Sequence, residues 1–359
     1  MITYQKYFKN KKVLITGHTG FKGSWLTLWL KLMGANIFGV SNSYPKKNNH
    51  FSALKLKGIK NYNLDICELQ KLKKLIFKIK PDFIFHLAAQ SLVKKSYKFP
   101  LKTFHSNSVG TLNLLESLRS LKNNCSVVLI TSDKSYKNIE TNRGYKEEDV
   151  LGGEDPYSAS KACAELIITS YIKNFINKKN INIAVARAGN VIGGGDWSDD
   201  RIIPDSMKSW SVGDKAVIRN PSSTRPWQFV LEVLRGYLIL SIKLKKDNQR
   251  KLFGQAFNFG PNSKQNKTVI SLVREIKKNF QNIEWKISKS TNKIKESRLL
   301  RLNSSKSSKI LNWQPILNFE KTINFTSEWY MNDLKKKKNT YENSKSILTN
   351  YCSLISKKI

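Results

Sequence analysis

The chain has 359 residues, which is enough for one large domain or two modest ones that bury a core without disulfide support. Its 63 Lys and Arg residues against 26 Asp and Glu residues give a formal net charge of +37, which first suggests nucleic acid binding. The lysines are spread throughout the chain, however, and no block interleaves them with aromatic residues as a stacking groove would. We therefore predict no nucleic acid partner.

The four cysteines (Cys67, Cys125, Cys163 and Cys352) are widely separated, with no CxxC pair and no Cys/His cluster. This spacing fits a reducing compartment and argues against a metal site. No apolar run approaches the length of a membrane span, and the polar segment 1–12 lacks the apolar core of a signal peptide. We predict a cytoplasmic protein with no metal ion and no membrane partner.

Apolar runs rich in β-branched residues alternate with helical patterns along the first half of the chain. The first predicted strand, 12–16, ends at Gly17, and a helix is expected to begin near Gly23. Further strands are expected over 36–40, 82–87, 126–131 and 183–187, and helices over 69–79, 111–121 and 158–175. This alternation is typical of an α/β fold with a doubly wound, mostly parallel Rossmann sheet.

From about Asn190 the pattern becomes irregular, and 193–197 and 220–227 are predicted as loops. We predict two units and a tail: a dinucleotide-binding domain over 1–188 to which the chain returns around 229–262, a smaller C-terminal substrate-binding lobe from 189–228 and 263–333, and a basic tail, 334–359. The tail begins with the lysine run 335–338 and is predicted to be solvated, either disordered or a docking helix.

The loop after the first strand carries glycines at three-residue spacing: Gly17, Gly20 and Gly23. Gly17 permits the tight turn, Gly20 lets backbone amides approach a pyrophosphate, and Gly23 allows close helix packing. The loop therefore predicts a dinucleotide cofactor.

The residues after the second strand leave the choice between NAD and NADP open. Segment 40–43 lacks the carboxylate that usually holds the ribose 2′-hydroxyl of NAD, whereas Lys46 and Lys47 would suit a 2′-phosphate. Lysine is so abundant here that this pair carries little weight. Asp65, followed by Ile66, is placed either to read the adenine amino group or to cap the next helix.

The segment 131–134 (TSDK) and the pair Tyr157 and Lys161 predict a redox centre with an extra acid and base. Four residues apart, Tyr157 and Lys161 share one helix face. A lysine ammonium and an oxidised nicotinamide lower the pKa of the neighbouring phenol and make it a base for a substrate hydroxyl. Asp133 and Lys134 are more than a plain sugar oxidoreductase needs, unless they are only a solvated charge pair.

Over about residues 11–315 these features resemble the extended short-chain dehydrogenase/reductase superfamily, which modifies nucleotide-activated sugars with bound NAD. The stretches 16–26, 86–93, 187–197 and 225–228 look most like the CDP-glucose branch of its nucleotide-sugar 4,6-dehydratases. Two local departures are Ser108 after Asn107, where the motif usually has a β-branched residue, and the missing carboxylate of the second strand.

The resemblance implies that CDP-glucose is oxidised at C4, loses water across C5 and C6, and is reduced at C6. Tyr157 would take the C4 hydroxyl proton with help from Ser132, and Lys161 would position the ribose and tune Tyr157. Lys134 would remove the C5 proton, for which its amine must be neutral, and Asp133 would protonate the departing hydroxyl.

The resemblance also implies which residues surround the ligands. Those expected at NAD are Gly17, Thr19, Gly20, Phe21, Gly23, Asp65, Ile66, Leu87, Ala88, Ala89, Asn107, Thr131, Tyr157 and Lys161. Those expected at the nucleotide-diphosphate sugar are Gln90, Asn190, Arg201 and Arg225. Asn190 and Arg225 would lie near the pyrophosphate and Arg201 near the base, although each also reads as a turn cap, a loop residue or a surface charge.

Several alternatives stay open. Inverting UDP-N-acetylglucosamine 4,6-dehydratases also carry Asp-Lys here, a C4 epimerase needs neither of these two groups, and a non-catalytic descendant would sense NAD or bind nucleic acid. The helices 111–121 and 158–175 resemble those that pair in a four-helix contact, so we expect a homo-oligomer, a dimer or a dimer of dimers. By the same analogy the product would serve a surface polysaccharide.

Overall fold

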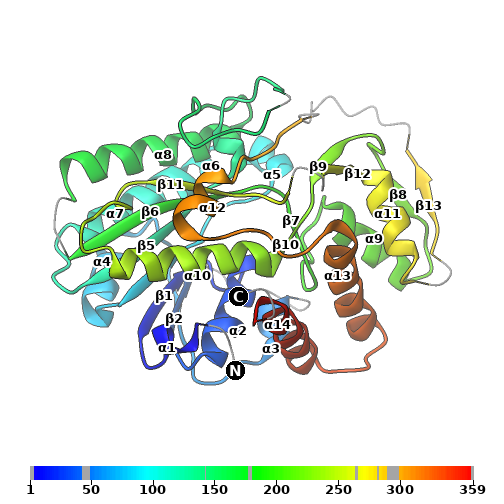
Figure 1. Ribbon diagram of the computed structural model, residues 1–359, viewed down its shortest axis with the longest axis horizontal. Helices are drawn as coiled ribbons and strands as arrows, with labels where there is room; N and C mark the ends of the chain where they lie inside the picture. The colour runs from blue at the N-terminus through cyan, green and yellow to red at the C-terminus, as the bar shows by residue number, and fades with distance from the viewer. Residues whose placement is uncertain are drawn as a thin grey trace.

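The computed structural model describes residues 4–42, 49–141, 143–176, 180–262, 266–280, 283–288 and 299–356. Seven parallel strands form the central sheet, in the order β11-β6-β5-β4-β1-β2-β3 (Figure 1). Their bounds are β1 Lys12–Thr16, β2 Asn36–Ser41, β3 Lys60–Asn63, β4 Phe83–His86, β5 Cys125–Ile130, β6 Ile181–Ala188 and β11 Ala256–Phe259. The predicted doubly wound, parallel sheet is confirmed, and the predicted strands are present with small shifts at their ends.

Strand β1 is the point at which the winding of the sheet reverses. In register, Lys12 lies opposite Asn36 of β2, and Val13 lies opposite Phe83 of β4. From β1 the chain winds outward to β2 and β3, then returns to the other side of β1 for β4, β5 and β6. Ligands of doubly wound folds bind at the carboxyl ends of the strands beside such a switch point.

Helices cover both faces of the sheet because consecutive strand side chains point to opposite faces. The helices are α1 Gln5–Phe8, α2 Phe21–Leu32, α3 His50–Leu54, α4 Leu69–Ile79, α5 Val93–Lys98, α6 Pro100–Phe104, η1 His105–Val109, α7 Gly110–Leu118, η2 Asp133–Ser135, α8 Pro156–Asn174, α9 Ile202–Ser211, α10 Val230–Lys246, α11 Val269–Lys277, α12 Ser305–Leu311, α13 Phe319–Leu334 and α14 Thr340–Ser356. Leu14 faces α4, α7 and α8, whereas Val13 and Ile15 face the core formed with α2 and α10.

Beyond β6, β11 extends the central sheet, whereas the other described strands form short pairs outside it. They are β7 Val191–Ile192 with β10 Gln228–Phe229, β8 Ala216–Ile218 with β13 Trp285–Ile287, and β9 Thr224–Pro226 with β12 Asn266–Thr268. Together with α9 and α11, the pairs β8–β13 and β9–β12 lie at the right of Figure 1 and form what we call the small lobe.

Of the alternatives predicted for the tail 334–359, the solvated, disordered segment is wrong for residues 340–356, which form a docked helix. Residues 340–356 form α14, which lies beside α2 and α3 in Figure 1. Ile347, Leu348, Tyr351 and Ile355 on this helix are at most 1% exposed. Their helical spacing was the signal for a packed face, which the preceding lysine run obscured.

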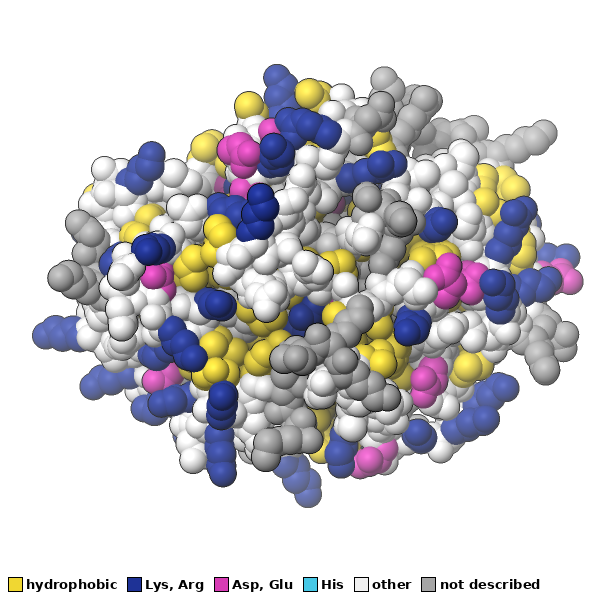
Figure 2. All heavy atoms as spheres, in the orientation of Figure 1, with side chains coloured by type: hydrophobic (Ala, Val, Ile, Leu, Met, Phe, Trp, Pro, Cys, Tyr) yellow, Lys and Arg dark blue, Asp and Glu magenta, His cyan; other side chains and the backbone are white. Residues whose placement is uncertain are grey.

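Four structural features bear on the expectations drawn from charge and composition. Figure 2 shows Lys and Arg side chains spread around the visible face rather than gathered on one element. All four cysteines are free. Within the described part of the chain, no helix is long and apolar enough to cross a bilayer, and no group of three or more His, Cys, Asp and Glu is suited to a metal ion.

Burial lowers the pKa of three histidines, His18, His50 and His86, and so makes stability depend on pH; the two with the largest shifts are His50 and His86. His50 and His86 are 2% and 3% exposed, and His86 is hydrogen-bonded to Thr16 and Thr111. Burial lowers the pKa of each histidine to about 3. Below about pH 6.5 the unfolded chain therefore binds protons that the folded chain does not, so stability present above this pH is lost progressively as the pH falls toward about 3.

We expect the free energy of unfolding to fall by about 1 kcal/mol per histidine between about pH 6.5 and 5.5. Urea unfolding at a series of pH values measures this change. The variant His86→Gln should lose one histidine's share of the slope. A wild-type profile that is flat over this range would contradict the prediction.

Candidate active site

A cleft of about 650 Å³ opens at the carboxyl ends of β1, β4 and β5, beside the switch point of the sheet. It brings together most of the predicted residues: Gly17, Thr19, Gly20, Phe21, Gly23, Asp65, Ile66, Leu87, Ala88, Ala89, Thr131, Ser132, Asp133, Lys134, Tyr157, Asn190, Arg201 and Arg225. Gln90, Asn107 and Lys161 do not line it. Residues from the glycine loop (17–23) and from the small lobe thus face one another across one space.

The glycine loop is held close to β4 by contacts that leave no room for a side chain. Gly17 has a φ of +74°, and a Cβ there would lie 2.7 Å from the amide nitrogen of Ala88. A Cβ at Gly23 would lie 2.1 Å from the carbonyl oxygen of Gly17. A Cβ at Gly20 would lie at 3.4 Å from the same oxygen, which is an ordinary contact. The fold therefore requires Gly17 and Gly23, whereas Gly20 keeps the backbone open toward the cleft at the start of α2.

A carboxylate does lie near the end of β2, supplied by another part of the chain. Asp65 accepts hydrogen bonds from Asn42 Nδ2 at 2.9 Å and from the Cys67 amide at 2.9 Å. Partial burial raises the pKa of Asp65, but these hydrogen bonds outweigh burial and leave the pKa lowered. Asp65 does not cap α4, whose N-cap is Glu68. Lys46 and Lys47 lie outside the described residues.

Ser132 begins the short helix η2 and connects two of the predicted catalytic groups. Its Oγ accepts from the Lys134 amide at 3.2 Å and donates to Asp133 Oδ1 at 2.9 Å. Asp133 is 5% exposed, and burial raises the pKa of its carboxyl, although Lys134 and the hydrogen bond from Ser132 oppose this effect. A Cβ at Gly189 would lie 2.8 Å from Asp133 Oδ2, so glycine makes room for the carboxyl. Burial therefore leaves the pKa of the Asp133 carboxyl above its ordinary value.

Tyr157 lies in the first turn of α8, which Asp155 caps by accepting the Tyr157 amide at 3.0 Å. Burial raises the pKa of Tyr157 to about 12, and a hydrogen bond with Ser132 offsets only part of the rise. The predicted lowering of this pKa involves the nicotinamide ring as well as Lys161, and it stays a prediction. Lys161 Nζ donates instead to the carbonyl of Ile130 at 3.4 Å. Burial lowers the pKa of Lys161 to about 8.

A buried ion pair lies behind η2. Arg187 and Glu165, at 4% and 3% exposed, are joined by two hydrogen bonds of 2.7 Å, from Nε to Oε1 and from Nη2 to Oε2. Glu165 Oε1 also accepts from Thr131 Oγ1 at 2.6 Å, and it lies 3.3 Å from Ser135 Oγ, whose single proton is shared with the Ser132 carbonyl at 2.7 Å. These two hydroxyls flank Ser132, Asp133 and Lys134 in the sequence. The ion pair therefore fixes both ends of the segment that carries the predicted acid and base.

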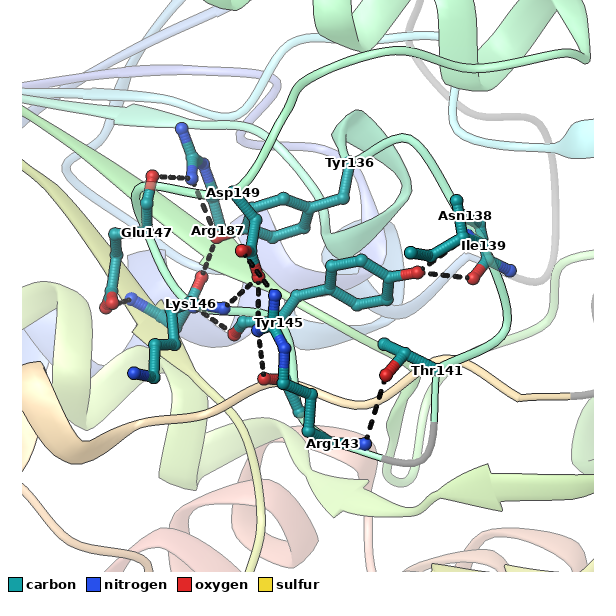
Figure 3. Close-up of polar contacts among 12 residues, drawn as sticks. Tyr136, Asn138, Ile139, Thr141, Arg143, Tyr145, Lys146, Glu147, Asp149 and Arg187 are labelled. Atoms are coloured by element: carbon teal, nitrogen blue, oxygen red, sulfur yellow. Dashed lines mark hydrogen bonds and ion pairs between the residues drawn. The ribbon is translucent and has the colours of Figure 1, made fainter.

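Arg187 also holds the loop that follows η2, as Figure 3 shows. Its Nη1 donates to Tyr136 Oη at 2.7 Å and to the carbonyl of Glu147 at 3.0 Å. Tyr136 stacks on Tyr145, with ring centroids 5.2 Å apart, and Tyr145 Oη accepts from the Ile139 amide at 2.8 Å. The loop 136–149 is thus tied to the same guanidinium that neutralises Glu165.

Gln90 and Asn107 lie behind the residues that line the cleft and hydrogen-bond to the loop after β4. The Gln90 side chain is occupied by its own loop, with Nε2 donating to the Leu92 carbonyl and to Thr103 Oγ1, each at 3.1 Å. Asn107 binds the Gln90 backbone, accepting its amide at 2.8 Å and donating to its carbonyl at 3.0 Å. The prediction that Gln90 contacts the substrate therefore finds no support in this arrangement, because its amide points into the loop.

The structure adds cleft residues that the sequence did not single out. Lys22 belongs to the glycine loop, and burial lowers its pKa to about 7, with Lys161 acting in the same direction. Lys94 and Arg219 both bind Asp200, at 2.5 and 3.1 Å. Of these four residues, Lys22 alone could have been predicted at the cleft, because it lies within the glycine loop. Lys94, Asp200 and Arg219 come from distant segments of the chain.

Comparison with known proteins shows the family of the chain. A family profile described as GDP-mannose 4,6 dehydratase matches residues 14–326. The chain belongs to this family. CDP-glucose 4,6-dehydratase from Salmonella typhimurium is 39% identical over 333 residues, which cover 91% of this chain and 92% of that protein.

Two solved structures show the same fold. Epimerase Mth375 from Methanothermobacter thermautotrophicus has a TM-score of 0.78 at 24% identity and covers 92% of this chain and 96% of its own. The dTDP-glucose 4,6-dehydratase from Bacillus anthracis, solved in complex with NAD, has a TM-score of 0.75 at 22% identity and covers 90% of this chain and 98% of its own.

The buried ion pair makes a prediction about stability. Glu165→Gln keeps the shape of the side chain but leaves the Arg187 guanidinium buried without a counter-charge, so we expect the free energy of unfolding to fall by about 3 to 5 kcal/mol. The control is Glu116→Gln, whose 3.0 Å pair with Arg119 is partly exposed and should be worth less than about 1 kcal/mol. Equal losses in urea unfolding would contradict the prediction.

Proposed function

We propose that the protein is a NAD-dependent nucleotide-sugar 4,6-dehydratase that converts CDP-glucose into CDP-4-dehydro-6-deoxyglucose and water. The observation that carries the proposal is that Asp133 and Lys134 line the same cleft as Ser132 and Tyr157. An epimerase returns hydrogen to a rotated C4 ketone and needs no acid and base for elimination. The 39% identical relative that bears the name CDP-glucose 4,6-dehydratase supports this choice of substrate.

The residues at the glycine loop fit NAD. The start of α2 presents backbone amides to the cleft, and Gly20 leaves them open to a pyrophosphate. Asp65 would hold the adenosine part of NAD, and its negative charge beside the end of β2, where Asn42 holds it, disfavours the 2′-phosphate of NADP. The NAD complex of the Bacillus anthracis relative supports the same cofactor.

Oxidation at C4 needs a base for the hydroxyl proton, and we assign that role to Tyr157. When bound, NAD would accept hydride from C4 and later return it to C6, and the positive charge of its ring would oppose the effect of burial on the Tyr157 pKa. Ser132 hydrogen-bonds both Tyr157 and Asp133. Lys161, bonded to the end of β5, would hold the ribose from behind Tyr157.

Elimination follows because the C4 ketone acidifies the hydrogen on C5. Lys134 takes that proton, the C5–C6 double bond forms as the C6–O bond breaks, and Asp133 donates its proton to the departing hydroxyl, which leaves as water. The raised pKa of Asp133 suits this donor role. Lys134 returns a proton to C5 as C6 is reduced. The C4 hydroxyl proton passes from Tyr157 through Ser132 to Asp133, which restores the acid and balances the protons.

The substrate's nucleotide lies, in this proposal, under the small lobe. Asn190 and Arg225 would hold the pyrophosphate, because a guanidinium matches phosphate oxygens, and Arg201 would lie near the base. We assign 1–188, with the return at 229–262, to NAD, and 189–228 with 263–333 to the substrate. The free cysteines suit the reducing cytoplasm, in which we place the reaction.

We also propose a homo-oligomer formed through α5, α6 and α8, which pack against one another. These helices and their connection expose a group of large apolar side chains. Its members and their exposed fractions are Tyr97 47%, Phe99 42%, Leu101 81%, Phe104 37% and Leu166 63%. A second copy of the same surface would cover this patch. The predicted four-helix contact named α7 and α8, and of these two helices only α8 carries a member of the patch, Leu166.

The proposed reaction is tested by incubating purified protein with CDP-glucose in heavy water, without added reductant. We expect a 4-keto-6-deoxy sugar with deuterium at C5, because the Lys134 amine exchanges its protons with solvent. Lys134→Ala should lower turnover by about 10²-fold or more and accumulate reduced cofactor, whereas Tyr157→Phe should block its formation. NMR and mass spectrometry of the sugar and cofactor absorbance are the measurements.

Lys137→Ala, an exposed lysine near the same turn, is the control and should leave turnover unchanged. Unchanged CDP-glucose, or a C4 epimer that still bears its C6 hydroxyl, would reject the proposal. Turnover of UDP-N-acetylglucosamine with inversion at C5 would assign the protein to the other dehydratase branch.

The oligomer is tested by light scattering after size exclusion. We expect the double variant Leu101→Glu and Leu166→Glu to be monomeric, because each carboxylate would be buried unpaired in the contact. Val212→Glu, at a site 72% exposed outside this patch, should leave the oligomer intact. A monomeric wild-type protein would refute this contact.

A further inference from the structure

A buried series of hydrogen bonds joins the two C-terminal helices to the glycine loop. Trp329 Nε1 donates to Ser344 Oγ at 2.8 Å, and Ser344 Oγ lies 2.9 Å from His50 Nε2. His50 Nδ1 lies 2.7 Å from Ser24 Oγ, which donates to the carbonyl of Phe21 at 2.8 Å. We call these five residues the His50 network.

The chemistry of its two ends fixes the direction of every bond. The Trp329 indole can only donate, and the Phe21 carbonyl can only accept. Ser344 therefore accepts from Trp329 and donates to His50 Nε2, and the protonated Nδ1 of neutral His50 donates to Ser24. Ser24, His50, Trp329 and Ser344 are at most 2% exposed, so each of these bonds is shielded from water. Loss of one member leaves its neighbours with unsatisfied buried groups.

The same helices hold the opposite wall of the cleft. A Cβ at Gly194 would lie 2.0 Å from the Trp329 ring, and a Cβ at Gly195 would lie 2.6 Å from the His50 ring. Tyr330 Oη donates to the carbonyl of Asp196 at 2.5 Å. Gly193 and Asp196 line the cleft across from the glycine loop. The glycine run 193–195, predicted only as a loop, thus lets α13 and α3 approach closely enough to set the spacing of the two walls.

We propose that Ser344 and His50 are positioning residues that act through Ser24 to hold the glycine loop in the shape that binds the pyrophosphate of NAD. The proposal rests on the proposed function for the identity of this ligand. Neither residue lines the cleft, so neither acts on the reacting atoms. The last helix of the chain is on this view part of the support of the cofactor site.

The test compares two variants that each remove one buried hydroxyl from α14. Ser344→Ala breaks the His50 network, whereas Tyr351→Phe removes bonds to Glu232 and Arg235 on α10. Affinity for NAD is measured by calorimetry and stability by thermal unfolding without NAD. We expect Ser344→Ala to weaken NAD binding about fivefold, the value of one net hydrogen bond, and Tyr351→Phe to leave affinity within about twofold while lowering the unfolding temperature.

Ser24→Ala breaks the network at its other end, and it replaces Ser344→Ala as the test if that variant does not fold. We expect its effect on affinity to match, and the double variant to bind no more weakly than either single one, because both remove the same connection. Unchanged affinity in Ser344→Ala, or an equal loss in Tyr351→Phe, would overturn the proposal.

Hydrogen exchange of the segment 17–24 in cofactor-free protein separates this proposal from the proposed function. We expect faster exchange in Ser344→Ala than in Tyr351→Phe, and equal exchange would refute the His50 network as a positioning device. A wild-type protein that does not bind NAD would instead count against the proposed function.

Discussion

The buried pair of Arg187 and Glu165 is the interaction on which the rest of the site depends. Removing two charges from water is costly, and their attraction offsets that cost only when the geometry is bidentate and the remaining lone pairs are satisfied. Here the Glu165 carboxylate also accepts from Thr131 and, in a shared bond, from Ser135, while Nη1 of the Arg187 guanidinium donates to Tyr136 and to the carbonyl of Glu147. Satisfying the ion pair therefore fixes the segment between the two hydroxyls, which carries Ser132, Asp133 and Lys134.

Local signals explain which parts could be predicted from the sequence. The strand at 12–16, the glycine loop and the Tyr157 helix each show their character within a few residues, and the parallel sheet follows from their alternation. The 131–134 segment was recognisable because four chemically distinct residues are adjacent. Each of these features depends on residues that are close to one another in the sequence.

The features that escaped prediction depend on contacts between distant segments. The carboxylate beside β2 comes from Asp65, held by Asn42, and no spacing rule connects the two residues. The burial of α14 depends on α2 and α3, from which about 300 residues separate it, so the lysine run before it was misleading. The orientation of Gln90 is decided by Thr103 and by its own loop, and burial, which a sequence does not reveal, sets the pKa of Tyr157.

Burial has opposite effects on the acids and the bases of this cleft, and that contrast explains how it is suited to proton transfer. It raises the pKa of Asp133 and lowers those of Lys22 and Lys161 to about 7 and about 8, so desolvation alone brings carboxyl and amine groups toward a common range. Burial raises the pKa of Tyr157 to about 12, because the phenol also loses contact with water, and this rise makes the phenol a weaker acid. A positive charge placed against the phenol would oppose that shift, as the hydrogen bond with Ser132 already does in part. In the proposed reaction, the fold itself therefore raises the pKa of the elimination acid, Asp133, whereas the pKa of the oxidation base, Tyr157, depends on the charge of what binds beside it.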